Sequence, residues 1–412
     1  MPEGAYPVTM SMIVPIKGEF EKAIPVLETL QAAGFEAYFV GGSVRDALLG
    51  KSVNDVDIAT SAFPEEIKKL FNKTVDVGIE HGTVMVLLEG ESYEVTTFRT
   101  ESTYQDYRRP DSVTFVRSLE EDLKRRDLTI NAFAMDNEGR IQDFFDGEKD
   151  LKQQIIRAVG KPEERFNEDA LRMMRAVRFA SQLGFHLEAD TFYAIVVNAH
   201  LLENIAVERI QVEFVKMAMG DYLLQGMEAL FTTNLYQYCP GLKHGKLALR
   251  RFSLIPAKLK KERHVWALLL YFLGIQNPKE GQAILRHWRL SNKIISDSVQ
   301  LLELILYRHH LPLNHYIVYR YTPTLIWEAE ELLEVIKLPS DKQTAAKLIN
   351  TIPILERDEI DIDGKAIMNV VNARGGRWLG EAIAMAEKAV VLGAVENDQQ
   401  AILNWLQKYK YI

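Results

Sequence analysis

The sequence has little cysteine and no long hydrophobic run. Cys239 is the single cysteine among 412 residues, which excludes a disulfide framework and a cysteine-built zinc site and indicates a reducing compartment, the cytoplasm. No run of about 18 apolar residues occurs, so we expect no membrane-spanning helix. The start of the chain lacks a basic stretch ahead of its short apolar segment, so residues 1–19 are interpreted as an extension rather than as a signal peptide.

The charge is distributed unevenly along the chain. The formal net charge is -8, yet residues 243–293 contain twelve Lys and Arg and two acidic residues. Such a basic segment is typical of a surface that contacts phosphate backbones. The aromatic residues interleaved with it are Trp266, Tyr271, Phe272 and Trp288. These features leave open both a nucleic-acid partner and a basic surface that is merely solvated.

The hydrophobic pattern changes near residue 150. Before that point, short β-branched and aromatic runs alternate with helical segments; we expect strands at 38–42, 53–60, 83–90 and 93–100 and helices at 43–50 and 63–71. After it, apolar residues recur with helical spacing and strand patterns nearly vanish. The pattern therefore predicts an α+β fold, in which an N-terminal head with a small β-sheet is followed by a long helical remainder.

An acidic pair follows a glycine turn in the head. Because alternate side chains of a strand share a face, Asp55 and Asp57 are expected to lie side by side. Two adjacent carboxylates repel each other unless a cation lies between them, and paired hard oxygen ligands suit Mg²⁺. Gly41, Gly42 and Ser43 precede a helix, where backbone N–H groups are open to a phosphate. Each motif is common alone, but together they indicate a site for a nucleoside triphosphate and Mg²⁺.

Further polar residues extend this candidate site. Glu94 is either a third carboxylate of the same site or an acid on an edge strand. Arg126 could clamp a triphosphate through its guanidinium fork, while Asp127 and Asn131 could hold sugar hydroxyls. A polar helix cap would produce the same residues, so both interpretations of this segment remain open.

A row of charges occupies residues 167–179, which we predict to form one helix. Asp169, Arg172, Arg175 and Arg178 recur at every third position among apolar residues. A solvated helix face is the ordinary explanation of such a row. Neighbours spaced by three lie about 60° apart around a helix, so these four side chains cannot form one flat face.

The motifs occur together in an order that resembles a known family. GG-x-V-R-D, D-V-D, R-R-D-x-x-x-N, D-F-F-D-G at 143–147 and E-D-x-x-R at 168–172 resemble the bacterial class II tRNA CCA-adding enzymes, nucleotidyltransferases of the polymerase β superfamily. The resemblance is strong over residues 35–215 and weaker beyond. VERI at 207–210 and the glycine-containing segment 363–380 also look like landmarks of that family.

The resemblance implies a domain plan and a reaction. It implies a polymerase β-like nucleotidyltransferase head followed by an extended helical neck, body and tail, with tRNA bound by the body and tail; the expected boundaries are 1–19 for the extension, 20–150 for the head, 151–215 for the neck, 216–325 for the body and 326–412 for the tail. The expected reaction is template-independent addition of C, C and A to the tRNA 3′ end from CTP and ATP. In it the tRNA 3′-hydroxyl attacks the nucleotide α-phosphate with Mg²⁺ and releases pyrophosphate. The acceptor arm of tRNA is the expected partner, and a homodimer is compatible with the sequence.

The resemblance also gives the candidate residues their roles. Asp55 and Asp57 would hold Mg²⁺ as catalytic carboxylates, with Glu94 beside them. The residues expected at the incoming nucleotide are Gly42, Ser43, Arg45, Arg126, Asp127, Asn131, Asp169, Arg172, Arg175 and Arg178. D-F-F-D-G would form a hinge-like strand end between head and neck. Residues 106–115 resemble a flexible loop associated with the switch from C to A addition, which favours a full CCA enzyme over a relative that adds only C.

The implied pairing of Asp169 and Arg172 with the base has a chemical basis. Asp accepts hydrogen bonds and Arg donates them. Cytosine and adenine each offer an amino donor beside a ring-nitrogen acceptor, whereas uracil and guanine present the reverse order. An Asp/Arg pair would therefore leave buried groups unpaired with U and G, which rejects them efficiently. Glu168, four residues before Arg172, would hold the guanidinium in place.

Two alternatives remain open from the sequence. A bacterial poly(A) polymerase shares the head and neck motifs, and incorporation from ATP alone onto arbitrary RNA ends would identify it. A non-catalytic RNA-binding protein on a polymerase-like scaffold represents another class, although such a protein would not need clustered metal-binding carboxylates.

Overall fold

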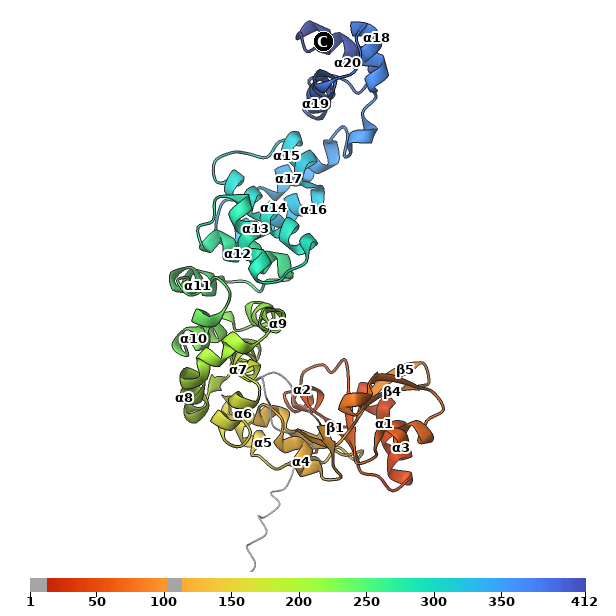
Figure 1. Cartoon of the computed structure of the whole chain (residues 1–412), viewed down its shortest axis with the longest axis vertical. Helices are drawn as coiled ribbons and strands as arrows, with labels where there is room; N and C mark the ends of the chain where they lie inside the picture. Colours follow the sequence, from red (N-terminus) through yellow and green to blue (C-terminus); the bar gives the residue numbers. More distant parts are fainter. Residues whose placement is uncertain (1–12, 102–112) are drawn as a thin grey trace, which may run out of the picture. The chain divides into compact units, whose positions relative to one another are not determined.

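A seven-stranded mixed sheet forms the centre of the head (Figure 1). The computed structural model describes residues 13–101 and 113–412. In sheet order the strands are β3 (Thr74–Gly78), β4 (Thr83–Leu88), β5 (Glu91–Thr97), β2 (Asp57–Thr60), β1 (Ala37–Val40), β8 (Phe133–Met135) and β9 (Ile141–Asp143). Strands β2 and β5 run parallel, and the other neighbours are antiparallel. The central strands have buried faces because helices cover the sheet; the helical segments of the head are α1 (Glu19–Ala32), α2 (Gly42–Leu48), α3 (Pro64–Leu70), η1 (Ile79–His81), α4 (Leu119–Lys124) and η2 (Thr129–Asn131).

The predicted strands and helices of the head are present, with shifted ends. The strand expected at 53–60 begins only at Asp57, so Asp55 precedes β2. Strand β3 was not predicted, because it is an edge strand whose Val75 and Val77 are 46% and 48% exposed and give no buried alternation. The loop expected at 106–115 lies outside the described residues up to 112. Residues 113–115, the end of the expected loop, are described, and they form strand β7 (Val113–Phe115), which pairs with β6 (Arg99–Glu101).

The neck consists of helices and one short parallel strand pair, β10 (Ile155–Ile156) with β11 (His186–Leu187). The helical segments that follow the sheet in the first unit are α5 (Gly147–Gln153), α6 (Pro162–Glu168), α7 (Leu171–Leu183), α8 (Ala189–Asn198), η3 (Ala199–Asn204), α9 (Val207–Ala218), α10 (Leu223–Thr232) and η4 (Leu235–Tyr238). Head and neck together form one compact unit, which extends to Lys246, and Leu247–Ile412 form a second. The finer domain boundaries given above stay a prediction.

The single helix expected over 167–179 is wrong. Helix α6 ends at Glu168, and Asp169 adopts an extended conformation with φ -138° and ψ 103°. The Asp169 carboxylate accepts a hydrogen bond from the backbone N–H of Leu171 at 3.0 Å. This local bond competes with the helical ladder, as Asp side chains commonly do at helix ends. Asp169 therefore lies in the break before α7, and the helical spacing applies only to the three arginines.

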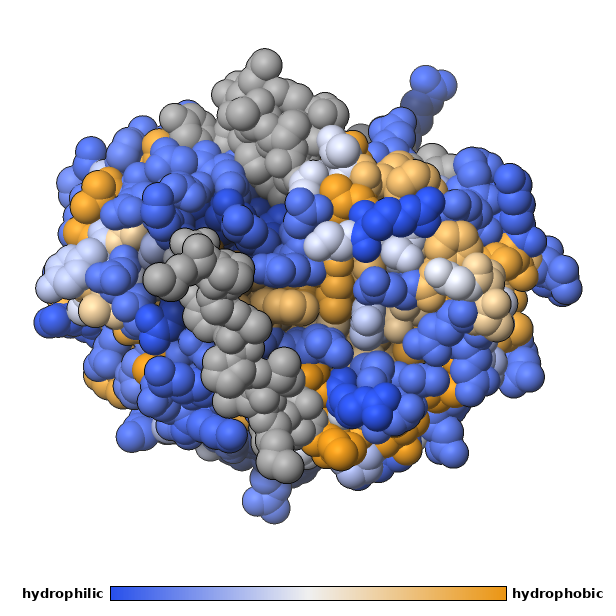
Figure 2. Space-filling view, turned by 90° about the horizontal axis from the view of Figure 1, so that it is seen from below, coloured by the Kyte–Doolittle hydropathy of each residue, from blue (hydrophilic) through white to orange (hydrophobic). Residues whose placement is uncertain are grey.

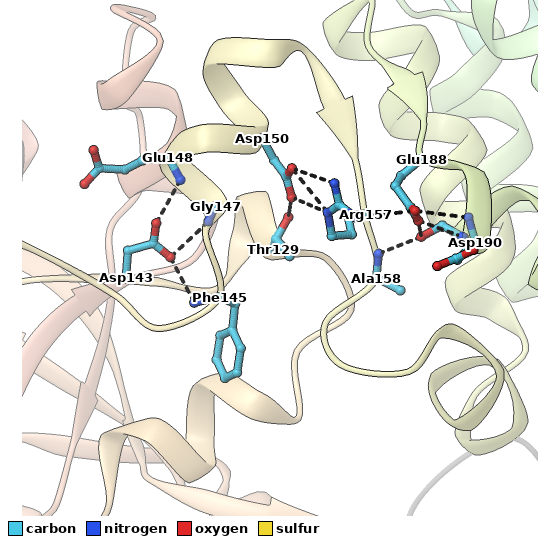
Figure 3. Close-up of polar contacts among 11 residues, drawn as sticks. Thr129, Asp143, Phe145, Gly147, Glu148, Asp150, Arg157, Ala158, Glu188 and Asp190 are labelled. Carbon is cyan, nitrogen blue, oxygen red and sulfur yellow. Dashed lines mark hydrogen bonds and ion pairs between the residues drawn. The ribbon is translucent and has the colours of Figure 1, made fainter. Parts of the chain in front are cut away.

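Two carboxylates stabilise the segment that joins head and neck (Figure 3). Asp143, at the end of β9, accepts backbone hydrogen bonds from Phe145 at 3.1 Å, Gly147 at 3.0 Å and Glu148 at 2.9 Å. Asp150, which is 1% exposed, pairs with Arg157 at 3.0 Å. The D-F-F-D-G motif is thus the expected strand end, bound to the start of α5; its hinge role stays a prediction.

The second unit is helical in all its described elements. These are α11 (Lys246–Ser253), which begins at the boundary, α12 (Glu262–Phe272), α13 (Pro278–His287), α14 (Asn292–Arg308), α15 (His315–Tyr321), α16 (Pro323–Val335), α17 (Lys342–Thr351), η5 (Arg357–Glu359), α18 (Gly364–Val371), α19 (Arg377–Val391) and α20 (Gln399–Lys408). Trp266 and Trp288 are fully buried, with ring centroids 4.9 Å apart. Their part in a nucleic-acid surface is therefore excluded, because at helical spacing they face the core instead.

The basic residues of this segment remain at the surface. Arg263 is half-buried and pairs with Asp297 at 2.9 Å, while the other eleven Lys and Arg of residues 243–293 are exposed. On the face shown in Figure 2, hydrophilic residues predominate and hydrophobic ones are interspersed among them. Within the described ranges, no helix is long and apolar enough to cross a membrane, as expected.

Candidate active site

A pocket of about 550 Å³ brings the head and neck motifs together. Its lining comes from the glycine turn, strand β2, the segment after α4, helix α7 and helix α9; the residues are Gly41, Gly42, Arg45, Asp57, Arg125, Arg126, Asp127, Asn131, Asp169, Leu171, Arg172, Arg175, Arg178, Phe179, Gln182 and Arg209. Ten of the thirteen candidate residues line it. Asp55, Glu94 and Ser43 do not, and the Ser43 hydroxyl instead donates to the Val40 carbonyl at 3.1 Å.

The glycine turn lies against the acidic strand because of the sheet register. Val40, at the end of β1, pairs with Asp57, so the next residue, Gly41, passes beside the Asp57 carboxylate. Gly41 has φ +77°, and a Cβ there would lie 3.1 Å from Arg126 Nη1 and 3.7 Å from Asp57 Oδ2. A side chain at this position would be strained and would also enter the pocket.

Replacing Gly41 therefore tests the fit of the turn. We expect Gly41→Ala to lower nucleotide addition by about tenfold or more, and to cost about 1 kcal/mol of stability. Gly50→Ala is the matched control, because Gly50 has φ +68° but nothing within 4 Å of its added Cβ. Equal losses of activity in the two variants, measured with thermal unfolding in parallel, would show that backbone strain alone is responsible.

The two aspartates interact electrostatically, although Asp55 precedes β2; their position on one face of a strand stays a prediction. Asp55 and Asp57 are exposed and Val56 between them is buried. Loss of hydration raises the pKa of Asp57, Arg126 opposes this shift, and the Asp55 carboxylate adds to it. A divalent cation would relieve the repulsion between the two carboxylates, so the donor set fits a hard metal ion.

Glu94 lies next to this pair in the sheet. It pairs with Asp57 across the parallel strands β2 and β5 and is also exposed. In the described part of the chain, however, no three His, Cys, Asp or Glu side chains form a group that could hold a metal by themselves. A cation here would need further ligands, which substrate phosphates can supply. The catalytic role of Glu94 stays a prediction.

A buried polar network forms the wall between head and neck. Asn131 accepts from Arg45 Nη1 at 2.5 Å and donates to Asp127 at 3.2 Å. Asp127 also accepts from Arg175 Nε at 2.6 Å. Arg126 lies within 3.4 Å of the Asn131 carbonyl oxygen. This network orients Arg45, Arg126 and Arg175 toward one pocket before any ligand is bound.

Asp127 gives the network a pH dependence. Burial alone would raise its pKa, but Arg175, Asn131 and Arg172 hold the pKa at about 2. Because this folded-state pKa is below the ordinary value of 3.8, the ionised group stabilises the fold above about pH 4, and this contribution is lost as the pH falls toward 2.

We therefore expect Asp127→Asn to destabilise the protein at pH 7 by about 2 kcal/mol, a difference that shrinks as the pH approaches 2. Urea unfolding of both proteins at pH 7, 5 and 3 measures it. A difference that stays constant over this range would contradict the ionic role of Asp127.

Helix α7 and the preceding break contribute the charged row. Arg172 donates to Glu168 at 2.6 Å, as predicted, and to the Arg125 carbonyl at 3.0 Å. Arg178 forms an ion pair with Glu213 of α9 at 3.0 Å. All three arginines of the row line the pocket. The break at Asp169 and the long guanidinium side chains bring the row together despite its angular spread on the helix.

Sequence reasoning missed Arg209 and Phe179, which line the pocket, and Glu213, which supports it. Arg209 pairs with Asp169 at 2.7 Å, and Glu213 pairs with Arg178. Phe179 lies under three guanidinium groups, with Arg178 Cζ 4.1 Å from its ring centroid. The VERI segment at 207–210 was noticed only as a landmark. Its role could not be inferred, because its contacts are made about 40 residues away in the chain.

Comparison with known proteins places these features in a family context. A model described as the Poly A polymerase head domain matches residues 37–157, and one described as tRNA nucleotidyltransferase domain 2 matches residues 257–406. The CCA-adding enzyme of Enterococcus faecalis is 50% identical over 96% of this chain and 97% of its own length. The CCA-adding enzyme of Ligilactobacillus salivarius is also 50% identical, over 95% of this chain and 97% of its own.

Solved structures agree with the sequence relatives. The crystal structure of the Bacillus stearothermophilus CCA-adding enzyme in complex with CTP has a TM-score of 0.86 and 40% identity, and the match covers 96% of this chain and 98% of that one. The Thermotoga maritima CCA-adding enzyme complexed with tRNA has a TM-score of 0.59 and 19% identity, with 95% of each chain covered. The second likeness concerns the fold alone.

Proposed function

The chain belongs to the family of CCA-adding enzymes, and from this premise we propose that it adds C, C and A to the 3′ end of tRNA from CTP and ATP. The observation that carries the proposal is a single pocket that joins the Asp57 carboxylate to the Asp169/Arg172 pair. One group of residues would bind the reacting phosphates, and the other would recognise the base. A scaffold that only binds RNA would need neither.

The family implies dependence on a divalent metal ion, and we propose that the ion is Mg²⁺. Asp55 and Asp57 would hold it, with phosphate oxygens completing its coordination. When bound, the ion lowers the pKa of the attacking 3′-hydroxyl and stabilises the pyrophosphate that leaves. Glu94, adjacent to Asp57 in the sheet, is proposed to assist this pair of aspartates.

The remaining head residues are proposed to hold the triphosphate and sugar. Arg45 and Arg126 present guanidinium groups to the pocket, and Gly42 leaves its backbone accessible there.

Arg175 would contact the nucleotide while Asp127 fixes its position. Asp127 already accepts from three protein donors, since Leu128 N–H also donates to it at 2.9 Å. Its main task would therefore be orientation. Ser43 is directed away from this site, and its hydroxyl would support the turn rather than the nucleotide.

Base recognition would be performed by protein groups alone. Asp169 would accept from the amino group of cytosine or adenine, and Arg172 would donate to the adjacent ring nitrogen. Uracil would place its carbonyl against the Asp169 carboxylate and its N–H against Arg172, leaving both pairs unsatisfied. The selection of C and A therefore needs no nucleic-acid template.

The test is incubation with tRNA that lacks its 3′ CCA, with labelled CTP and ATP supplied singly and together. We expect two C residues from CTP alone and completion of CCA only with both nucleotides. Long runs of A from ATP alone on unrelated RNA would identify a poly(A) polymerase instead. Binding of tRNA without any incorporation would identify a non-catalytic RNA-binding protein. The proposed partners are tRNA, CTP and ATP, and the proposed site of action is the cytoplasm.

A further inference from the structure

We infer that Arg209 is a positioning residue for base selection, which acts by fixing the carboxylate of Asp169. This inference rests on the proposed function and deepens it. Arg209 lies in α9 and donates through Nη2 to Asp169 Oδ2 at 2.7 Å and through Nη1 to Oδ1 at 3.4 Å. Both residues line the pocket.

Asp169 needs such support because of where it lies. It occupies the break between α6 and α7, with extended backbone angles, so regular helix packing does not determine the orientation of its side chain. The Leu171 N–H contact engages one carboxylate oxygen, Oδ1. The second contact, from Arg209, fixes the plane of the carboxylate, since two donors on two oxygens prevent its rotation. Each oxygen keeps acceptor capacity for a further donor.

The fixed plane bears directly on base choice. An ionised carboxylate accepts from the amino group of C or A and repels the carbonyl of U or G. A carboxylate that rotates freely would meet the amino group in a less favourable geometry, so the right base would gain less over the wrong one. Discrimination would then depend on Arg209 although Arg209 need not touch the base.

Helix α9 supports the charged row at two points. Glu213 follows Arg209 by four residues, so the two lie on one face of the helix. Glu213 pairs with Arg178 at 3.0 Å, and both of these side chains are buried. Helix α9 thus pairs Arg209 with Asp169 at the first position of the row and Glu213 with Arg178 at the last. Of these two α9 residues, Arg209 alone pairs with a residue proposed to recognise the base, so Glu213 offers a comparison within the same helix.

The experiment measures kcat/KM for CTP and UTP on tRNA lacking CCA. We expect Arg209→Gln to lower the CTP-to-UTP ratio by about tenfold or more. Arg209→Lys keeps the charge but not the two-pronged contact, and should give an intermediate ratio. Glu213→Gln should impair the use of both nucleotides and leave their ratio close to that of the unaltered enzyme.

Arg157→Gln is the matched control. Arg157 is also a neck arginine in an ion pair, its side chain is 38% exposed against 32% for Arg209, and it does not line the pocket. Arg157→Gln should leave the CTP-to-UTP ratio unchanged. Its shift in thermal unfolding shows how much stability the loss of one neck ion pair costs.

A background variant separates positioning from other effects. In Asp169→Asn protein, Arg209→Gln should cause no further loss of discrimination, because the carboxylate through which it acts is absent. The inference is overturned if Arg209→Gln lowers the use of CTP and UTP by the same factor, or if it alters the ratio equally in the Asp169→Asn background. Absence of C and A addition by the unaltered protein would instead refute the proposed function.

Discussion

Asp57→Ala is expected to abolish nucleotide addition while tRNA binding stays within about twofold of that of the unaltered protein. Loss of hydration raises the pKa of Asp57, and its attraction to Arg126 is partly offset by repulsion from Asp55, so its removal should cost the fold little. The substitution removes one of the two proposed metal ligands. The rate should fall about 1,000-fold or more, equivalent to about 4 kcal/mol of transition-state stabilisation.

Asp76→Ala is the control for this prediction. Asp76 is an exposed acid of the same sheet, on β3, and pairs with Lys68 at 3.0 Å away from the pocket. It should leave the rate unchanged. Steady-state addition measures the rate, and fluorescence anisotropy with labelled tRNA measures binding. If Asp57→Ala loses both tRNA binding and activity, the aspartate supports the fold instead of the chemistry.

Arg172→Ala is expected to relax base choice more than it harms the fold. Arg172 is 8% exposed and its guanidinium is held by Glu168 and by the Arg125 carbonyl, so it is fixed before a base arrives. Without it, the ring-nitrogen position of the base loses its selective donor. The preference for CTP over UTP should fall by about 10- to 100-fold, since polar mismatches in a buried site carry most of such discrimination.

Arg172→Lys provides the graded comparison, because an ammonium supplies charge without the planar fork. Its preference should lie between those of Arg172→Ala and the unaltered protein. If competition between CTP and UTP gives the same preference in Arg172→Ala as in the unaltered protein, Arg172 does not recognise the base.

Local sequence patterns predicted the local structure of the head well. Asp55 and Asp57 are exposed on either side of a buried Val56, and Gly41 immediately precedes α2, which begins at Gly42. Both features depend on residues within a few positions of one another. The Glu168–Arg172 contact was also predicted, from the helical spacing of four residues, and it forms although the helix breaks between the two residues.

Long-range contacts were not predictable from the same patterns. The break at Asp169 arises from one side-chain hydrogen bond that competes with the helical ladder. The pairing of Arg209 with Asp169 spans 40 residues, and no periodicity within either segment signals it. Trp266 and Trp288 lie in a strongly basic segment, yet the packing of the second unit buries both.

The proposed function makes one claim above the others, namely that protein side chains in this single pocket select C, C and A in order. The most direct measurement is sequencing of the 3′ ends formed on tRNA lacking CCA when all four nucleoside triphosphates are present with Mg²⁺. We expect ends that read CCA, with three pyrophosphates released per tRNA. Ends that contain U or G at frequencies set by nucleotide concentration, or long runs of A, would contradict it.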